Sequence, residues 1–320
     1  RLHSTVPICA KAHHGDDADM TKNWMEAIDA RSAAALASGA LQPVAAEQTE
    51  MEDAGMRFIV RWVSSLAVKD AARAASTTTS PAATPVAIPG GPRDPNFNPF
   101  LNPDPELTVG PIGTEHVAIL NKFPLCDRHL VLARRAFEEQ LLPLARSDFA
   151  ALAELMAEAG GIGLYNGGTA AGASQRHKHV QWMPDTEGNA SLRLFAAGLP
   201  TDLPEHGVAR HPALSMQHCF VRVRCGEGVA VDVAAGSLLE GFRRACDTLQ
   251  LKPGADGLLP PCNLLIHDGW LLMLPRSQEC FEGISISAVC FGGTLYTRQR
   301  EQIESIRRVG PLQALAAVGC

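Results

Sequence analysis

Apolar residues recur along the chain with a helical period in some segments and a strand period in others. The first helix is predicted over residues 21–38, where Thr21 would cap its start and Gly39 would end it. A mostly apolar run over residues 56–63 then predicts a strand. The N-terminal part of the chain is therefore expected to mix helix and strand.

The middle of the chain alternates more regularly. Apolar runs at 116–121 and 129–133, separated by a polar turn, predict a β-hairpin. A helix with one apolar face starts at Ser147 and should end at Gly160, before a short strand over 163–166. A glycine-rich loop leads from that strand into another, which runs from His177 to Trp182.

In the last third, strands are predicted at 219–224, 263–266, 270–275 and 284–290, and helices from about Ser237 and about Thr297. This order predicts an α+β fold with a largely antiparallel sheet flanked by helices. The segments HVAILNKFPLCDRHLVLARR and CNLLIHDGWLLMLPRS also resemble each other weakly, which suggests a duplicated half.

Three regions are expected on this reading. Residues 1–19 form a disordered leader, residues 20–200 a catalytic half, and residues 201–320 a half that completes the ligand site. The segment 76–95 holds five prolines and no aromatic residue, so it is predicted to be a mobile surface loop within the first half.

Composition narrows the choice of partners. The chain has a formal net charge of −6, which gives no broad basic field for duplex nucleic acid, so a phosphate-bearing ligand would need a local site. No window reaches the roughly 18 uninterrupted apolar residues that would span a bilayer. The compartment is indicated by the cysteines. The nine cysteines form no C-x-x-C pair, and this favours reduced thiols in the cytoplasm. Targeting to an organelle stays open, because residues 1–19 could be a transit-peptide remnant.

The segment NGGTAAGASQRHKHVQW, which begins at Asn166, carries the candidate chemistry. A strand places His177, His179 and Gln181 on one face and Lys178 on the other. Either histidine alone would fit a satisfied core position. The preceding glycine-rich loop changes this balance, because its backbone amides could cradle a polyphosphate.

Two chemistries compete for this histidine pair. Zinc binding would need further ligands, and the predicted face offers no Cys, Asp or Glu, so no metal ligands are predicted. Nucleophilic catalysis fits better, because a neutral imidazole can attack phosphorus and form a phosphoramidate. Gln181 can donate a hydrogen bond but cannot exchange protons with water, which suits an acceptor that is already an anion.

The segment GASQRHKHVQ resembles the active-site segment of the diadenosine tetraphosphate phosphorylases, or ATP adenylyltransferases, of the histidine triad superfamily. The resemblance covers most of the chain from about Ala35 to Arg298, including NPFLNPDPELTVG and CNLLIHDGWLLMLPRSQECFEGISISAVCFGGTLYTR. It departs at residues 76–95 and at Gln278, where a lysine is expected. It implies a histidine triad-like fold, built from two fused halves, that cleaves diadenosine tetraphosphate with phosphate to ATP and ADP.

The resemblance also implies roles for individual residues. His179 would be the nucleophile, the His177 carbonyl would hold its Nδ1 proton, and Gln181 would donate to an oxygen of the α-phosphate. No tightly bound cofactor is expected, although Mg²⁺ or Mn²⁺ could accompany the polyphosphate. Small nucleotides and phosphate are the expected partners, without nucleic acid or membrane. The implied substrate-binding residues are Lys69, Asn121, Lys122, Asn166, Gly172, Ala173, Ser174, Gln175, Asn263 and Arg276.

Two other functions stay open. A hexose-1-phosphate uridylyltransferase would share the fold and the H-x-H-x-Q face, but such enzymes typically show H-P-H, whereas the middle residue here is Lys178. The paired-cysteine zinc signature of many uridylyltransferases is also missing from the sequence. The second alternative is a non-catalytic nucleotide-binding protein that has kept this fold.

Overall fold

The computed structural model describes residues 23–43, 47–63 and 98–320. The predicted leader, Lys69 and the predicted mobile loop lie outside the described residues. The first helix, α1 (Trp24–Ser38), is capped by Asn23, whose side chain accepts a hydrogen bond from the Glu26 amide at 3.0 Å. The expectation that Thr21 caps this helix is therefore wrong, because the cap lies two residues later.

A nine-stranded sheet forms the centre of the molecule, and every neighbouring pair in it is antiparallel. This arrangement confirms the predicted fold class. The strands, in spatial order, are β3 (Thr108–Ile112), β4 (His116–Leu120), β5 (Leu130–Arg134), β7 (His179–Met183), β6 (Ile162–Gly167), β10 (Cys262–His267), β11 (Trp270–Pro275), β9 (Cys219–Arg222) and β8 (Val208–Ala209).

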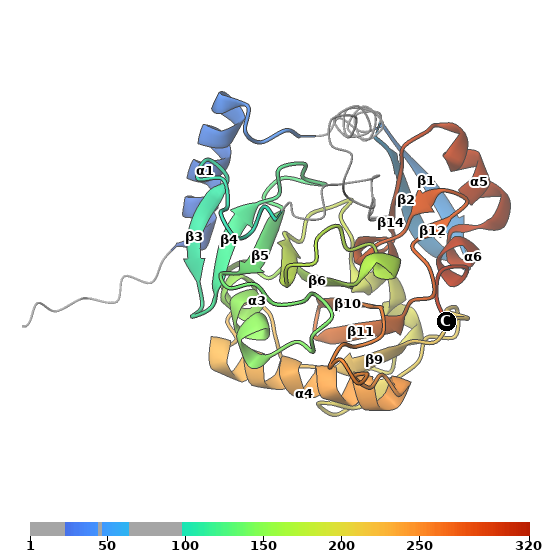
Figure 1. The fold of residues 1–320 in the computed structure, drawn as a ribbon. Helices are drawn as coiled ribbons and strands as arrows, with labels where there is room; N and C mark the ends of the chain where they lie inside the picture. Colours follow the sequence, from blue (N-terminus) through green and yellow to red (C-terminus); the bar gives the residue numbers. More distant parts are fainter. Residues whose placement is uncertain (1–22, 44–46, 64–97) are drawn as a thin grey trace, which may run out of the picture.

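Two helices, α3 (Arg146–Ala159) and α4 (Val231–Leu249), cover one face of this sheet (Figure 1). They pack against each other, and the rings of Phe149 and Phe242 lie 5.8 Å apart. The predicted start of α4 at Ser237 is wrong. The Ser237 hydroxyl is buried within the helix, where it accepts a hydrogen bond from the Arg224 amide at 2.9 Å instead of capping the helix.

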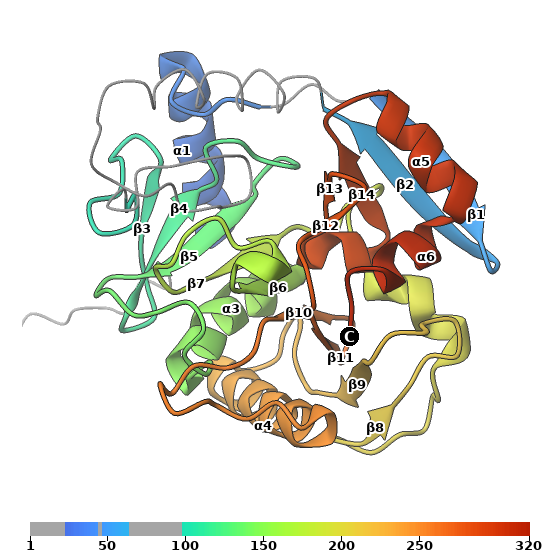
Figure 2. The ribbon, with the colours of Figure 1, turned by 45° about the vertical axis from the view of Figure 1, so that its right-hand side comes forward.

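The other face packs against a small sheet and several short helices (Figure 2). Its three strands are β1 (Glu47–Asp53), β2 (Met56–Trp62) and β14 (Thr294–Thr297). The associated helices are η3 (Leu192–Gly198), η4 (Ala288–Gly292), α5 (Glu301–Val309) and α6 (Pro311–Ala316). The remaining short elements are η2 (Thr169–Ala171), β12 (Cys280–Phe281) and β13 (Ile284–Ser285).

Two predictions for the C-terminal region need correction. The strand predicted over 284–290 is only the short β13, followed by the 3₁₀ helix η4. All five residues of η4 are buried, and a continuous apolar run does not distinguish a buried strand from a buried helix. The helix predicted from Thr297 begins at Glu301, because Thr297 still pairs with β2.

The large sheet contains the same topology twice. In the first unit the elements follow one another along the chain as β4, β5, α3, β6 and β7, and the strands lie in the sheet in the order β4-β5-β7-β6. In the second unit the chain order is β8, β9, α4, β10 and β11, and the order in the sheet is β8-β9-β11-β10. The two units meet where β6 pairs with β10. The hairpin β4–β5 therefore corresponds to β8–β9. The weak similarity between two sequence segments instead pairs β4–β5 with β10–β11, which is not its topological equivalent.

Within the described residues, no helix is both long enough and apolar enough to cross a membrane.

Candidate active site

Strand β7 places the candidate catalytic side chains on one face of the sheet. Val180 and Trp182 point into the core beneath α3, so His179 and Gln181 lie on the opposite face. Lys178 points the same way as Val180, and its ammonium lies 3.3 Å from the Asp148 carboxylate of α3. His177 pairs with Glu139 in an isolated bridge just before the strand begins. The predicted separation of Lys178 from His179 is confirmed.

The His179 imidazole is held in one orientation. Its Nδ1 lies 2.8 Å from the His177 carbonyl oxygen, so Nδ1 carries the proton and Nε2 carries the free lone pair. Among the described residues, Nε2 has no hydrogen-bond partner. Burial lowers the pKa of His179 to about 4, so the ring is neutral near pH 7. A neutral imidazole with an unengaged Nε2 is prepared for nucleophilic attack.

Gln140, which the sequence analysis missed, clamps the backbone of the catalytic strand. Its side-chain oxygen accepts a hydrogen bond from the His179 amide at 2.8 Å. Its side-chain nitrogen donates to the carbonyls of His179 at 3.0 Å and Asn166 at 2.9 Å. The Gln140 side chain therefore ties β7 to β6 where the loop between them begins. No local sequence pattern distinguishes it from a surface glutamine.

Gln181 also has a partner that the sequence analysis missed. Its side-chain oxygen lies 2.9 Å from Nε2 of His129, which precedes β5. Val131 of β5 lies opposite Gln181 of β7. His129 comes two residues before Val131, so its side chain points to the same face of the sheet as Gln181. The sequence gives no signal for this contact, because it depends on β5 and β7 lying side by side in the sheet.

Aromatic side chains surround the two histidines. The ring of Phe100 lies 5.0 Å from that of His179 and 5.8 Å from that of His177. The half-exposed ring of Phe137 lies 5.6 Å from that of His177. The side chain of Asn98 approaches His177 Nδ1 at 3.1 Å, while His177 Nε2 donates to the Arg134 carbonyl at 2.7 Å. These contacts separate His179 from bulk water.

The glycine-rich loop is more self-contained than predicted. Gly172 adopts the left-handed conformation, with φ of 86°, and its amide donates to the Thr169 carbonyl at 2.9 Å. The Ala173 amide donates to the Gly168 carbonyl at 3.0 Å. A Cβ atom at Gly172 would lie 2.9 Å from Cβ of Ser287, so the loop lies directly against the second half of the chain. The amides of Gly172 and Ala173 are thus used within the loop.

Asn166, Asn263 and Arg276, all predicted to bind substrate, are joined to one another in a buried network. Asn166 Oδ1 accepts hydrogen bonds from Asn263 Nδ2 and from the Ala288 amide, each at 2.8 Å. Arg276 donates to Asn263 Oδ1 and to the carbonyls of Ile286, Gln278, Glu279 and Val318. The guanidinium is therefore occupied within the protein, and burial lowers its pKa to about 10. In this structure the network joins the two halves behind the glycine-rich loop.

A cluster of buried charges supports β7 from the helical side. The Asp148 carboxylate lies 2.8 Å from Nε2 of His116, 3.0 Å from Nε of Arg134 and 3.3 Å from Nζ of Lys178. It also accepts a hydrogen bond from the Ala145 amide at 2.7 Å. Although burial alone would raise it, these partners hold the pKa of Asp148 well below its usual range. The cluster fixes Lys178 and, through the backbone, its neighbours His177 and His179.

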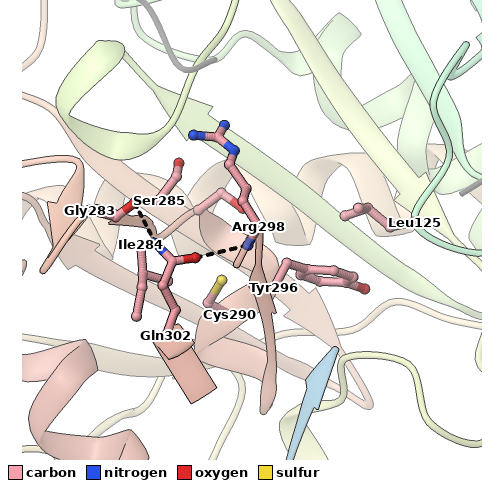
Figure 3. A pocket seen from close by; sticks show the side chains of 9 residues that line it. Leu125, Gly283, Ile284, Ser285, Cys290, Tyr296, Arg298 and Gln302 are labelled. Atoms are coloured by element: carbon pink, nitrogen blue, oxygen red, sulfur yellow. Dashed lines mark hydrogen bonds between the residues drawn. The ribbon is translucent and has the colours of Figure 1, made fainter. Parts of the chain in front are cut away.

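A cavity of about 120 Å³ lies between the 121–129 turn and the C-terminal segment (Figure 3). Tyr296 and Cys290 line it, and Gln302 spans one side through hydrogen bonds to the Gly283 carbonyl and the Arg298 amide. None of the residues that line it belongs to the predicted catalytic set.

The remaining predicted residues differ in exposure. Asn121 is half-buried, and its side-chain oxygen accepts a hydrogen bond from the Phe123 amide at 3.2 Å. Lys122 is exposed. Among residues 23–43, 47–63 and 98–320, no three His, Cys, Asp or Glu side chains are grouped so that they could hold a metal ion.

Two family models match the chain. The Ap4A phosphorylase N-terminal domain matches residues 16–194, and the ATP adenylyltransferase C-terminal domain matches residues 212–320. Two proteins of Saccharomyces cerevisiae are similar in sequence. Diadenosine 5',5'''-P1,P4-tetraphosphate phosphorylase 2 is 25% identical over 231 residues, and Protein APA1 is 26% identical over 230 residues. Each alignment covers 65% of this chain and 71% of the yeast protein.

Solved structures share the fold. The crystal structure of yeast Ap4A phosphorylase Apa2 superposes with a TM-score of 0.70 at 21% identity, covering 93% of this chain and 94% of that one. The structure of Apa2 in complex with Ap4A gives a TM-score of 0.70 at 23% identity, covering 93% of this chain and 97% of that one. The similarity therefore extends over both halves of the molecule.

Proposed function

Because the chain belongs to the Ap4A phosphorylase family and is a nucleotidyltransferase, we propose that it cleaves diadenosine tetraphosphate (Ap4A) with inorganic phosphate to ATP and ADP, and that it catalyses the reverse reaction. The observation that carries this proposal is the His179 ring, whose Nδ1 proton is held by the His177 carbonyl while Nε2 is unengaged. Yeast Ap4A phosphorylase Apa2, solved in complex with Ap4A, supports the choice of substrate.

In the first step, the Nε2 lone pair of His179 attacks the α-phosphorus of one adenosine. A nitrogen–phosphorus bond forms while the bond from that phosphorus to the bridging oxygen breaks. ATP leaves with the electron pair of the broken bond. No proton has to move, because Nδ1 keeps its proton and the His177 carbonyl stabilises the resulting positive charge on the ring.

In the second step, an oxygen of inorganic phosphate attacks the same phosphorus from the side that ATP has left. The nitrogen–phosphorus bond breaks, its electron pair returns to Nε2, and ADP is released. The attacking oxygen is already anionic, so no general base is needed. Gln181 donates to a phosphate oxygen in both steps and thereby stabilises the charge that develops there.

The polyphosphate would lie along the glycine-rich loop, where Ser174 and Gln175 are candidate contacts, and the exposed Lys122 of the turn between β4 and β5 is a further candidate. Asn166, Asn263 and Arg276 would support that loop from behind rather than bind phosphate directly. A divalent cation that accompanied the substrate would be held mainly by phosphate oxygens and waters, because Mg²⁺ takes few ligands from the protein. No step above depends on such an ion.

Incubation with Ap4A and phosphate, followed by chromatography, tests this function. ATP and ADP in equal amounts are expected, together with a radiolabelled adenylyl-enzyme that is absent in His179→Ala. Exchange between a uridylyl sugar and a hexose 1-phosphate would instead assign the chain to the uridylyltransferases. Nucleotide binding without either reaction would identify a non-catalytic binding protein.

A cytoplasmic location is our remaining proposal. It is supported by the cysteines, since all eight within the described residues are free thiols, as is usual in a reducing compartment.

A further inference from the structure

The orientation of the Gln181 amide is set by a single neighbour. Its side-chain oxygen faces Nε2 of His129 at 2.9 Å, and its side-chain nitrogen has no hydrogen-bond partner among the described residues. An amide can rotate by half a turn and exchange its oxygen and nitrogen at little steric cost. Whether Gln181 presents a donor or an acceptor to the substrate therefore depends on what His129 presents to Gln181.

A backbone amide determines whether the His129 nitrogen that faces Gln181 is a donor or an acceptor. The Leu125 amide, which can only donate, points at Nδ1 of His129 from 3.3 Å, and the Asn121 side-chain nitrogen lies 3.4 Å from the same atom. Nδ1 must therefore accept, so the proton of the neutral ring is on Nε2. Burial lowers the pKa of His129 to about 4, which keeps the ring neutral. His129 thus offers Gln181 a donor.

We propose that His129 is a positioning residue, which locks the Gln181 amide so that its NH₂ group, and not its oxygen, faces the α-phosphate. The proposal rests on the function given above. In the opposite orientation the NH₂ group would meet the N–H of His129, and the amide oxygen would face an anionic phosphate oxygen. Both contacts are repulsive, so His129 favours the one orientation that can stabilise the transition state.

The turn that carries His129 is built to hold this ring. The Asn121 amide donates to the His129 carbonyl at 2.9 Å and closes the turn, and the Asn121 side chain accepts a hydrogen bond from the Phe123 amide. His129 is buried, with 2% of its surface exposed, so water does not compete for its nitrogens. The donors on Nδ1 and the acceptor on Nε2 together define one tautomer in one orientation.

A double-mutant cycle tests the proposal, with the rate of adenylyl transfer from Ap4A as the readout. Gln181→Leu removes the donor and is expected to slow transfer by about 10²–10³-fold. His129→Leu frees the amide and should slow it by about 10–10²-fold, mainly through kcat rather than KM. Because His129 acts only through Gln181, the double variant should be no slower than Gln181→Leu alone.

Two further variants separate positioning from stability. His129→Gln keeps an N–H donor near the position of Nε2 and should recover much of the loss. His218→Leu removes a different buried histidine, whose nitrogens meet the Met216 carbonyl and the His211 amide, each at 2.9 Å. It should lower the melting temperature without changing the rate of transfer. If His129→Leu fails to fold, His129→Phe, which fills the space of the ring but offers no N–H donor, replaces it in the cycle.

The outcomes distinguish failure of the positioning role of His129 from failure of the proposed phosphorolysis of Ap4A. If the His129 and Gln181 losses multiply in the double variant, His129 acts independently of Gln181 and the positioning role is refuted. The same holds if His129→Leu leaves kcat unchanged. If the wild-type protein itself produces no ATP and ADP from Ap4A and phosphate, the proposed function fails before the cycle begins.

Discussion

Replacing Gln140 by leucine should disable the enzyme and destabilise it at the same time. The Gln140 side chain hydrogen-bonds to the backbone of the nucleophile twice, at 2.8 Å to the His179 amide and 3.0 Å to the His179 carbonyl. Its third partner is the Asn166 carbonyl at 2.9 Å. Leucine has a similar volume but satisfies none of these groups.

The size of the effect follows from burial. Gln140 is 3% exposed, so water cannot replace the lost partners. A buried polar group left unsatisfied costs about 1–3 kcal/mol, and the carbonyls are less affected than the amide because each can accept elsewhere. The total loss should be roughly 3–5 kcal/mol. A displacement of His179 by about 1 Å would also slow adenylyl transfer by about 10²-fold.

Urea denaturation and single-turnover kinetics measure the two effects separately. Gln302→Leu is the matched control, because the Gln302 side chain also makes three hydrogen bonds to backbone groups, at 2.9, 3.1 and 3.2 Å; Figure 3 shows those to Arg298 and Gly283. Gln302 is half-exposed, so water can take over its partners, and the loss should stay below about 1.5 kcal/mol with no change in rate. Equal losses of stability in the two variants, or a normal rate in Gln140→Leu, would refute the clamp.

Four further predictions concern the buried histidines of the site and the charges beneath the nucleophile. His179→Ala should reduce kcat by orders of magnitude and abolish the adenylyl-enzyme, with an unchanged circular dichroism spectrum. Because burial lowers the pKa of His179 to about 4, single-turnover adenylylation should stay constant from pH 8 to about 5 and decline as the pH falls through 4; a midpoint near 6.5 would contradict the buried, neutral ring. The same lowered pKa values of His129 and His179 stabilise the fold fully above their unfolded value of 6.5, and calorimetry should show this contribution disappearing as the pH falls toward 4. Asp148→Asn should cost about 3 kcal/mol in urea denaturation, because it removes the one fully buried carboxylate beside Lys178 and Arg134 and leaves them the partly exposed Glu138. Asp29→Asn, which breaks an exposed pair with Arg128, should cost under about 1 kcal/mol.

The elements that could be predicted from the sequence are those with a strong local signal. Alternation placed His179 and Gln181 on one face of β7, and glycines ended α1 and α3 at the expected positions. The elements that were misplaced lack such a signal. The run over 284–290 is apolar throughout because η4 is buried on all sides, and its sequence does not distinguish strand from helix.

Residues that act through distant partners could not be found in this way. Gln140 lies 39 positions from His179, and His129 lies 52 positions from Gln181. Their roles depend on strand order, in which β7 lies between β5 and β6. Arg276 shows what the sequence leaves out about a predicted binding residue. A conspicuous cation near a predicted anion site suggests phosphate binding, yet its guanidinium is surrounded by backbone carbonyls.

The repeated topology explains why the molecule has one candidate catalytic face rather than two. Strand β11 occupies the place in the second unit that β7 occupies in the first. On the face that carries His179 and Gln181 in β7, strand β11 carries Trp270, Leu272 and Leu274, all buried in the core that packs against the small sheet. In the second unit this strand face therefore contributes to packing and carries no candidate catalytic group. The contribution of the second unit to the first is mechanical, because Asn263 and Ser287 fix the loop that leads into the catalytic strand.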